Sequence, residues 1–466
     1  MSYAEEMEEQ KRWKLLPAKS KVPWFHRLIE DEFLEPERVE DRILSSLKRN
    51  LTRATLGSPY YQKNSRDLKI SPESMTSHKE LSRWPILKRQ NILDHAKQLI
   101  LKKKGGRKGP EYWKSSSGTT GRPVRVLHST QSLGMFSLHV QRLLRWERWD
   151  PSLKLATIRV PDTMPRDRNG NQLSMGQTMI SPYWQHLGQF FHTGRHYSFS
   201  RLNPESEQLR WLDQHKPEYL ITYPGTLESL VLARNGLPTD SLKGARVISA
   251  QFTDGMRRRI SELTPLAIGQ NYGLNEVGIV ANRCRSGRYH VNYEHCHVEI
   301  VDEHDQPCSP GAQGRLIVTS LQNTAMPLIR YDSTDLARPA KGPCPCGRTS
   351  PSFLDIVGRH RSWRDTPDGT PARFNLLHGL IEGMPAHLCL NLHQFQIHQH
   401  IGPHYTLRLE TRGPMPEEFL EQVRNAWKEQ FESLDDLNIL EGEEIPPHPS
   451  GKQQPFLSDY QQKRQS

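Results

Sequence analysis

The part of this 466-residue chain with the clearest chemical content is a loop of small polar residues. It reads Ser115, Ser116, Ser117, Gly118, Thr119, Thr120, Gly121, Arg122, Pro123. Glycines allow tight turns in which successive backbone N–H groups point at one anion, and five hydroxyls add donors suited to phosphate oxygens. The loop is not a GxxxxGK[ST] phosphate loop, because no Lys-Ser/Thr pair follows the second glycine. The same composition is equally typical of a polar surface loop, so the loop alone does not distinguish a phosphate site from an ordinary loop.

Four later segments carry aromatic, acidic and basic side chains at short spacing. They are Tyr272-Gly273-Leu274-Asn275-Glu276, Arg330-Tyr331-Asp332-Ser333-Thr334-Asp335, Gly358-Arg359 and Pro449-Ser450-Gly451-Lys452. In order and spacing, these segments and the loop resemble motifs of the adenylate-forming ligase superfamily, which includes acyl-CoA synthetases, adenylation domains and luciferases. They are similar above all to the phenylacetate–CoA ligase branch and its relatives associated with capsule biosynthesis. The resemblance extends over roughly residues 55–460.

The resemblance implies a site for ATP and Mg²⁺. Tyr272 would lie on the adenine, and Glu276 would bind Mg²⁺ against the α-phosphate. Asp335 would accept hydrogen bonds from the ribose hydroxyls, and Arg359 would meet ribose or phosphate. Lys452 would reach the carboxylate and α-phosphate oxygens during adenylation, which makes it the leading catalytic candidate beside Glu276 and Arg359.

The loop residues Ser115–Arg122, together with Gly273 and Asn275, complete the predicted nucleotide-binding set. The chain departs from the family pattern at three places. Asn275 replaces a Ser or Thr, Thr334 replaces a Gly, and His360-Arg361 follows the Gly-Arg pair where the family has an acidic hinge residue.

The implied reaction is activation of a small carboxylic acid, in the first instance an aryl acid, as acyl-AMP, with transfer to coenzyme A. A second hypothesis keeps adenylation but gives the acyl group to a carrier-protein thiol or an amine. A third, a degenerate nucleotide-binding scaffold, is disfavoured because a scaffold needs none of the candidate reactive residues. No GxSxG or convincing Cys/His pair suggests a protein nucleophile. Four aromatic residues suit either an acid-binding slot or the core: Trp184, Phe190, Phe191 and Phe252.

Cys284, His290, Cys344 and Cys346 form a second candidate site. Three thiolates and one imidazole are an ordinary ligand set for tetrahedral Zn²⁺, and four protein ligands leave no open position, so the metal would be structural. The Cys-x-Cys-Gly-Arg run also resembles the phenylacetate–CoA ligase branch, where a zinc occurs near this position. The alternative is four unconnected residues. The remaining cysteines are expected to be ordinary thiols: Cys296, Cys308 and Cys389.

A histidine group near the C-terminus, His393, His398, His400 and His404, also suggests metal. His398 and His400 would share one face of a strand. Because no carboxylate or cysteine stands at a fixed spacing, the sequence does not predict a metal there.

The elements that must position these residues follow from hydrophobic periodicity. Residues 1–110 form a predominantly helical region, and residues 110–340 alternate strands with helices, which predicts an α/β sheet. Predicted strands are Leu155–Val160, Tyr219–Tyr223, Ala245–Ala250 and Leu316–Thr319, with helices at Glu207–His215 and Gly225–Asn235. We expect a large α/β N-terminal domain of β-sheets and packed helices over 1–358, then a small α+β lid domain over 359–466. In the lid, Asn391–Gln399 and Tyr405–Glu410 are predicted strands and Pro416–Leu434 a helix.

The bulk composition limits the classes of partner. The net charge of +11 suits a protein that handles polyanions such as ATP and coenzyme A. Nucleic-acid binding is disfavoured, because one basic run at 102–108 comes with no recognition motif. No apolar run is long enough to span a membrane and the N-terminus lacks a signal-peptide pattern, so we expect a cytoplasmic protein without a membrane partner. The oligomeric state stays open, a homodimer included.

Overall fold

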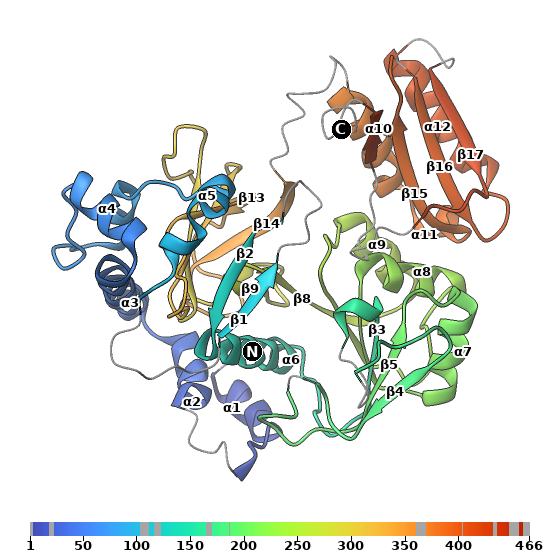
Figure 1. Ribbon diagram of the computed structural model, residues 1–466. Helices are drawn as coiled ribbons and strands as arrows, with labels where there is room; N and C mark the ends of the chain where they lie inside the picture. Colours follow the sequence, from blue (N-terminus) through green and yellow to red (C-terminus); the bar gives the residue numbers. More distant parts are fainter. Residues whose placement is uncertain are drawn as a thin grey trace. The chain divides into compact units, whose positions relative to one another are not determined.

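The computed structural model describes residues 3–17, 23–102, 111–115, 123–164, 170–185, 187–359, 370–402, 404–431, 436–446 and 456–459 (Figure 1). The chain divides into two compact units, each built from several chain segments. Unit 1 comprises Met1–Pro151, His186–His192 and Gly269–Arg361, and unit 2 comprises Ser152–Gln185, Thr193–Ile268 and Ser362–Ser466. Each unit is described by itself below.

The N-terminal part of unit 1 is helical, as the sequence predicts. Its helices are α1 (Tyr3–Lys11), α2 (Pro23–Glu30), η2 (Asp31–Phe33), α3 (Pro36–Gly57), α4 (Pro59–Asp67), η3 (His78–Arg83), α5 (Arg89–Leu99) and α6 (Thr130–Trp146). Helix α3 ends and α4 begins at Ser58, whose hydroxyl accepts a hydrogen bond from the Tyr61 N–H at 3.4 Å, the usual role of an N-cap serine. The apolar faces of α3 to α5 enter one core with the strands of this unit.

The strands of unit 1 form a continuous antiparallel array. Its order is β11 (Cys296–Val301), β12 (Gly314–Ser320), β13 (Tyr331–Pro339), β14 (Ser352–Arg359), β10 (Tyr289–Val291), β9 (Gly278–Arg283) and β8 (Ala267–Leu274). A separate hairpin pairs β1 (Glu111–Ser115) with β2 (Arg125–Ser129). The antiparallel β12–β13 and β13–β14 pairs carry irregular registers, so both edges of β13 are locally bent.

Unit 2 contains the parallel α/β layer. Strands β7 (Gly244–Val247), β6 (Tyr219–Thr222), β3 (Leu155–Arg159) and β5 (His196–Ser200) run parallel in that order, with antiparallel β4 (Thr178–Ser181) at the edge. Helices α7 (Glu205–His215), α8 (Pro224–Arg234) and α9 (Asp254–Leu263) alternate with the strands. Their apolar side chains form one core with β3, β5, β6 and β7. This is the βαβ arrangement that the alternating sequence predicts.

The C-terminal residues of unit 2 build a second sheet, whose apolar core also includes Leu232 of α8. Strands β17 (Leu437–Glu441), β16 (Tyr405–Thr411), β15 (Leu392–Gln399) and β18 (Phe456–Ser458) lie in that order, with helices α10 (Thr370–Gly383), α11 (Ala386–Cys389) and α12 (Glu417–Phe431) (Figure 1). On α12, Phe419, Val423 and Trp427 recur every four residues and are fully buried. The β15–β16 pair is antiparallel, whereas β17 and β18 are each parallel to their neighbour.

The predicted α/β class is confirmed, and each predicted strand and helix overlaps an observed one. Sequence patterns did not predict α6, α10, or the antiparallel course of β8 to β14. The division at residues 358 and 359 stays a prediction. Among the described helices, none combines the length and apolar character needed to cross a membrane.

Candidate nucleotide site and cysteine cluster

The first candidate motif lies on the hairpin between β8 and β9. Gly273 sits in a crowded place, because a Cβ atom there would lie 3.0 Å from the Gly278 carbonyl oxygen. Gly278 has φ +116°, and a Cβ on it would come within 2.8 Å of His295 Nε2. Glycine is therefore strongly favoured at position 278, and position 273 has little room for a side chain. The hairpin fixes the direction in which Tyr272, on β8, and Glu276, in the turn before β9, present their side chains.

Two tyrosine hydroxyls hold the two candidate carboxylates. Tyr272 Oη donates to Asp335 Oδ2 at 2.6 Å, and Tyr331 Oη donates to Glu276 Oε1 at 3.1 Å. Asp335 and Glu276 are each only 8% exposed. Burial raises the pKa of Tyr272 well above its usual value, and the nearby Asp335 raises it further, so the phenol stays protonated and remains a donor.

The backbone before Asp335 has an unusual conformation. Thr334 has φ +62°, in the left-handed region that favours glycine, which is the residue the family pattern has here. Two local hydrogen bonds stabilise the turn: Thr334 N–H donates to Asp332 Oδ1 at 2.8 Å, and Asp335 N–H donates to Ser333 Oγ at 3.1 Å. The chain therefore keeps a glycine-like turn with a β-branched residue, at a cost in backbone strain.

Asn275 links this hairpin to the end of β1. Its Nδ2 donates to the Ser115 carbonyl at 3.1 Å, and its own carbonyl accepts a hydrogen bond from His128 Nε2 at 3.0 Å. Burial lowers the pKa of His128 to about 4, and the charge of Lys114 lowers it further, so the ring is neutral at pH 7. Its Nε2 must carry the proton, because the partner is a carbonyl.

The structure therefore brings Ser115, Tyr272, Asn275, Glu276 and Asp335 into one connected region of unit 1. The backbone of Arg359, at the end of β14, pairs with Asp335 on β13. Other predicted residues lie outside the described part of the chain: Ser116, Ser117, Gly118, Thr119, Thr120, Gly121, Arg122 and Lys452.

Sequence reasoning missed three contributors to this region. Tyr331 was inside a quoted motif, but nothing in the sequence indicated that its hydroxyl holds Glu276. His128 had no sequence signal. Arg330, the first residue of that motif, is buried and donates to the backbone carbonyls of Ser82 and Trp84 at 2.9 and 2.6 Å. It fastens β13 to the helical region.

The aromatic residues considered for a substrate slot are mostly core. Trp184 is fully buried, and its indole N–H donates to the Leu153 carbonyl at 3.0 Å. Phe191 packs edge-on against Trp13 at 5.6 Å between ring centroids. Phe252 is also buried, with the Arg257 guanidinium 4.5 Å above its ring centre.

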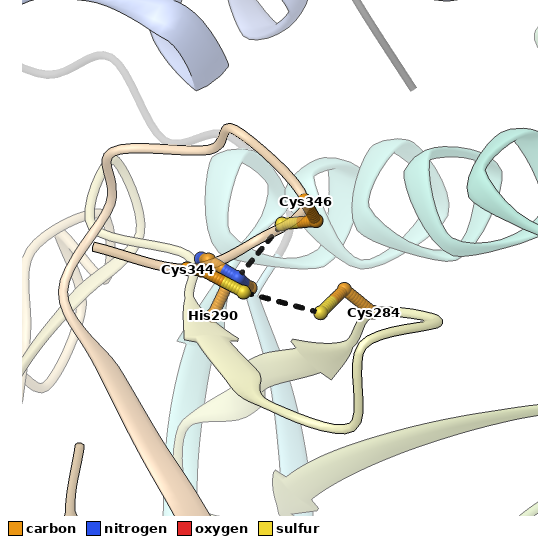
Figure 2. Close-up of side chains that lie close together, drawn as sticks. All are labelled: Cys284, His290, Cys344 and Cys346. Carbon is orange, nitrogen blue, oxygen red and sulfur yellow. Dashed lines mark hydrogen bonds between the residues drawn. The ribbon is translucent and has the colours of Figure 1, made fainter. Parts of the chain in front are cut away.

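The four predicted zinc ligands lie together in unit 1 (Figure 2). All four ligand atoms are within 4.8 Å of one another and the residues are buried. Cys284 Sγ is 3.7 Å from Cys344 Sγ, and Cys346 Sγ is 3.3 Å from His290 Nε2. A tetrahedral zinc with ordinary bond lengths places two sulfurs about 3.8 Å apart and a sulfur and a nitrogen about 3.6 Å apart. The donor set and its spacing therefore fit the ion.

Two tight turns present the thiols. Gly287, with φ +90°, donates from its N–H to the Cys284 carbonyl at 2.9 Å, and Gly347, with φ +80°, donates to the Cys344 carbonyl at 3.0 Å. Trp146 packs against the cluster, with its ring edge-on to His290. A turn at each cysteine is what allows two distant chain segments to converge on one point.

The electrostatics of the cluster favour a thiolate at Cys346, whereas the hydrogen bond with Cys346 raises the pKa of Cys284. The hydrogen bond with Cys284 lowers the pKa of Cys346 to about 2, and the one with His290 lowers it further. Burial lowers the pKa of His290, but hydrogen bonds to Cys344 and Cys346 outweigh burial and raise it overall. His290 Nδ1 lies 3.1 Å from Ser350 Oγ, a contact that leaves Nε2 directed at the thiols.

Comparison with known proteins agrees with this geometry. Residues 110–326 match the family model described as AMP-binding enzyme. The phenylacetate-coenzyme A ligase of Thermus thermophilus is 26% identical over 315 residues, which is 65% of this chain and 66% of that protein. The phenylacetate-coenzyme A ligase of Escherichia coli is 24% identical over 318 residues, 64% of this chain and 63% of that protein. The matches thus span about two thirds of the length of these curated relatives.

Solved structures show the same fold. A 2-hydroxyisobutyryl-CoA ligase in the postadenylation state, in complex with 2-HIB-AMP, has a TM-score of 0.67 and 17% identity, covering 93% of each chain. The same enzyme in complex with 2-HIB-AMP and CoA, in an open conformation, has a TM-score of 0.56 and 15% identity. The family-model match over residues 110–326, the relatives and the motif residues gathered in one region all show that the chain is similar to the AMP-binding enzymes of the adenylate-forming superfamily.

Proposed function

We propose that this protein activates a small carboxylic acid with ATP and Mg²⁺ as its acyl-AMP, and then transfers the acyl group to coenzyme A. The observation that carries the proposal is the pair of buried carboxylates, Asp335 and Glu276, each held by one tyrosine hydroxyl at 2.6 and 3.1 Å. The AMP-binding family match and the phenylacetate-coenzyme A ligase relatives support the same reaction.

Each carboxylate has a distinct task. Asp335 accepts hydrogen bonds from the ribose hydroxyls, while Tyr272 fixes its orientation and offers its ring to the adenine. Within the described residues no Lys or Arg pairs with Glu276, so its carboxylate keeps capacity for a cation. Glu276 would hold Mg²⁺, which when bound neutralises negative charge on the phosphates.

In the first half-reaction a carboxylate oxygen of the substrate bonds to the α-phosphorus of ATP, and pyrophosphate leaves. The transition state gathers negative charge on the α-phosphate oxygens. The loop from Ser115 to Arg122 and the ammonium group of Lys452 stabilise that charge, and Arg359 contacts ribose or phosphate. The reaction needs no nucleophile from the protein.

In the second half-reaction the coenzyme A thiol attacks the acyl carbon and AMP leaves. We infer that residues 359–466 act as a lid that turns about 359–363, presenting Lys452 in one pose and a different surface to the thiol in the other. A carrier-protein thiol or an amine is the alternative acceptor, which the departures from the family pattern at Asn275, Thr334 and Arg361 favour.

The cysteine cluster would hold a structural Zn²⁺ through Cys284, His290, Cys344 and Cys346. Support comes from the near-tetrahedral spacing of the ligand atoms and from the His290–Ser350 contact. Zinc bound there would link the β9–β10 turn to the loop after β13. Metal analysis of the purified protein, with Cys346→Ser as the comparison, tests this assignment.

The activity is tested by pyrophosphate release in Mg²⁺-ATP with hydroxylamine as the acyl trap, over a panel of aryl, alkyl and amino acids. We expect turnover with one acid class, and its loss in Lys452→Ala. Lys463→Ala, near the end of the same chain, is the matched control and should keep full activity. Replacing hydroxylamine with coenzyme A, a carrier protein or an amine then identifies the acceptor. A folded protein that binds no ATP would contradict the proposal.

A further inference from the structure

The register of the C-terminal sheet places three metal-binding side chains on one face. His398 pairs with Leu457 in the parallel β15–β18 pair, and Gln399 pairs with Ser458. Side chains alternate between faces along a strand, so His398 and His400 share a face, and Asp459 shares that face with Leu457. The sequence indicated no carboxylate for the histidines, but strand pairing brings Asp459 to His398 from 61 positions away.

The three side chains converge closely. Their ligand atoms all lie within 4.8 Å of one another. His398 Nε2 is 2.8 Å from Asp459 Oδ1, His400 Nδ1 is 3.6 Å from Asp459 Oδ2, and the two imidazole rings are 4.2 Å apart. The ring nitrogens of two imidazoles and both oxygens of one carboxylate therefore surround one position that a metal ion could occupy.

A further contact prepares His400 as a ligand. Its Nε2 lies 2.8 Å from Thr406 Oγ1 on the neighbouring strand β16. When Nε2 carries the proton and donates to that hydroxyl, Nδ1 keeps its lone pair and faces Asp459. Metal-bound histidines commonly have such a partner on the second ring nitrogen, which fixes both tautomer and ring orientation.

We propose that His398, His400 and Asp459 bind a divalent transition-metal ion at the β15–β18 edge of the C-terminal sheet. Two imidazoles and a carboxylate suit zinc, cobalt, nickel or copper, whereas magnesium and calcium prefer oxygen ligands. The side chains are 14%, 36% and 32% exposed, so water can reach the ion and complete its coordination.

The ion would fasten the C-terminal segment to the sheet. Strand β18 has only three residues, and a strand this short adds few hydrogen bonds. A metal bridging Asp459 to β15 adds a strong link at the end of that strand. Asp459 follows the catalytic candidate Lys452 by seven positions. The site shares no residue with the cysteine cluster and does not depend on the proposed reaction.

Cobalt titration of the chelator-treated full chain tests the proposal. We expect one Co²⁺ per chain that adds visible d–d absorption without the near-ultraviolet thiolate bands that Co²⁺ at the cysteine cluster would produce. In Asp459→Asn and in His400→Gln the apparent affinity for this ion should fall at least tenfold, by analogy with the loss seen when even an outer partner is removed. Circular dichroism shows whether each variant is folded.

The matched control is His393→Gln on the same strand. His393 Nδ1 forms a close pair with Glu410 at 2.6 Å, but among the described residues it belongs to no cluster of three metal-binding side chains. It should bind Co²⁺ like the wild type. The proposal is overturned if every Co²⁺ bound by the wild type brings thiolate absorption, or if folded Asp459→Asn and His400→Gln bind it unchanged.

Discussion

The nucleotide region and the cysteine cluster lie in the same unit and on strands of the same antiparallel array, yet they satisfy their polar groups differently. In the nucleotide region each carboxylate receives a hydrogen bond from a tyrosine hydroxyl, and we propose that the carboxylates also meet the ligand. In the cysteine cluster the three thiols and His290 Nε2 converge on one another, and Ser350 contacts the other ring nitrogen of His290. We therefore propose that the nucleotide region is arranged to bind a substrate, whereas the cysteine cluster is a self-contained set of side chains.

This difference predicts which property each region controls. A carboxylate that binds a substrate stabilises the transition state of the reaction and contributes little to the stability of the fold. A closed ligand set contributes to the folded state and little to the reaction. Variants in the two regions should therefore separate activity from stability, and four predictions test that separation.

The largest effect is expected at Asp335. Asp335→Ala removes the acceptor for two ribose hydroxyls, and hydrogen bonds to a charged group contribute about 1.5–3 kcal/mol each. We expect kcat/KM for ATP to fall about 100- to 10,000-fold while the melting temperature changes little. Asp355→Ala, which removes an exposed partner of Arg338 on β14, is the control and should leave both unchanged. A loss of stability in Asp335→Ala as large in free energy as its loss of activity would contradict the assignment of this residue to activity alone.

The cysteine cluster should show the opposite pattern. Cys346→Ser removes one zinc ligand, so we expect loss of bound zinc and a fall of about 3 kcal/mol in the free energy of unfolding. The adenylation rate of the protein that remains folded should equal the wild-type rate. Cys308→Ser, which lies outside the cluster, should change neither quantity. Denaturant titration and metal analysis measure both, and a cluster variant that stays stable but loses adenylation would reverse the assignment.

Buried histidines next to the nucleotide hairpin add a pH dependence. Burial lowers the pKa of His295 to about 4, with Val277 as its backbone hydrogen-bond partner, so the folded state holds the ring neutral. As pH falls below about 6.5, the unfolded state takes up the proton first. The stability from the neutral ring is present above pH 6.5 and is lost as pH falls toward 4.

Between pH 7 and pH 5 this loss amounts to about 2 kcal/mol for one such histidine. His295→Gln should therefore reduce the drop in unfolding free energy between these pH values by about that amount. His304→Gln, whose ring is largely exposed, serves as the control. An unchanged pH slope in His295→Gln would show that this ring is not held neutral.

The smallest effect is expected at Thr334, an exposed residue in a left-handed conformation. Thr334→Gly relieves the strain at φ +62° and keeps both local hydrogen bonds, since they use backbone N–H groups of residues 334 and 335. We expect a gain of about 1 kcal/mol in unfolding free energy with unchanged activity. Thr411→Gly, at the end of β16, should instead destabilise the protein. Calorimetry that found both variants destabilised would contradict the interpretation.

The sequence predicted the α/β layer and the main elements of the C-terminal sheet because their periodicity is strong and local. It did not predict α6, because Arg142 and Arg145 on that helix look like surface residues. In the structure both are buried, Arg142 against Glu294 at 2.6 Å and Arg145 against Glu32. A buried ion pair between distant segments has no local pattern.

The candidate sites likewise contain some residues that the sequence could identify and others that it could not. Tyr272, Glu276 and Asp335 could be chosen from motif order, and the four zinc ligands from residue type. The Tyr331–Glu276 contact and the position of Asp459 could not be chosen, since both depend on which strands pair. The roles proposed for the nucleotide residues stay predictions until the variants are measured.

Unit 1 also imposes an order on synthesis. Its first segment ends at Pro151, and its last begins at Gly269. Arg142 finds Asn292 150 positions later, so at translation speeds of about 5–20 residues per second the N-terminal segment waits roughly ten seconds or more for its partners. During that interval the apolar faces of α3 and α6 are without their strands. Nascent chains of this protein should therefore engage chaperones before residue 269 is made, and release them once β9 to β14 are complete.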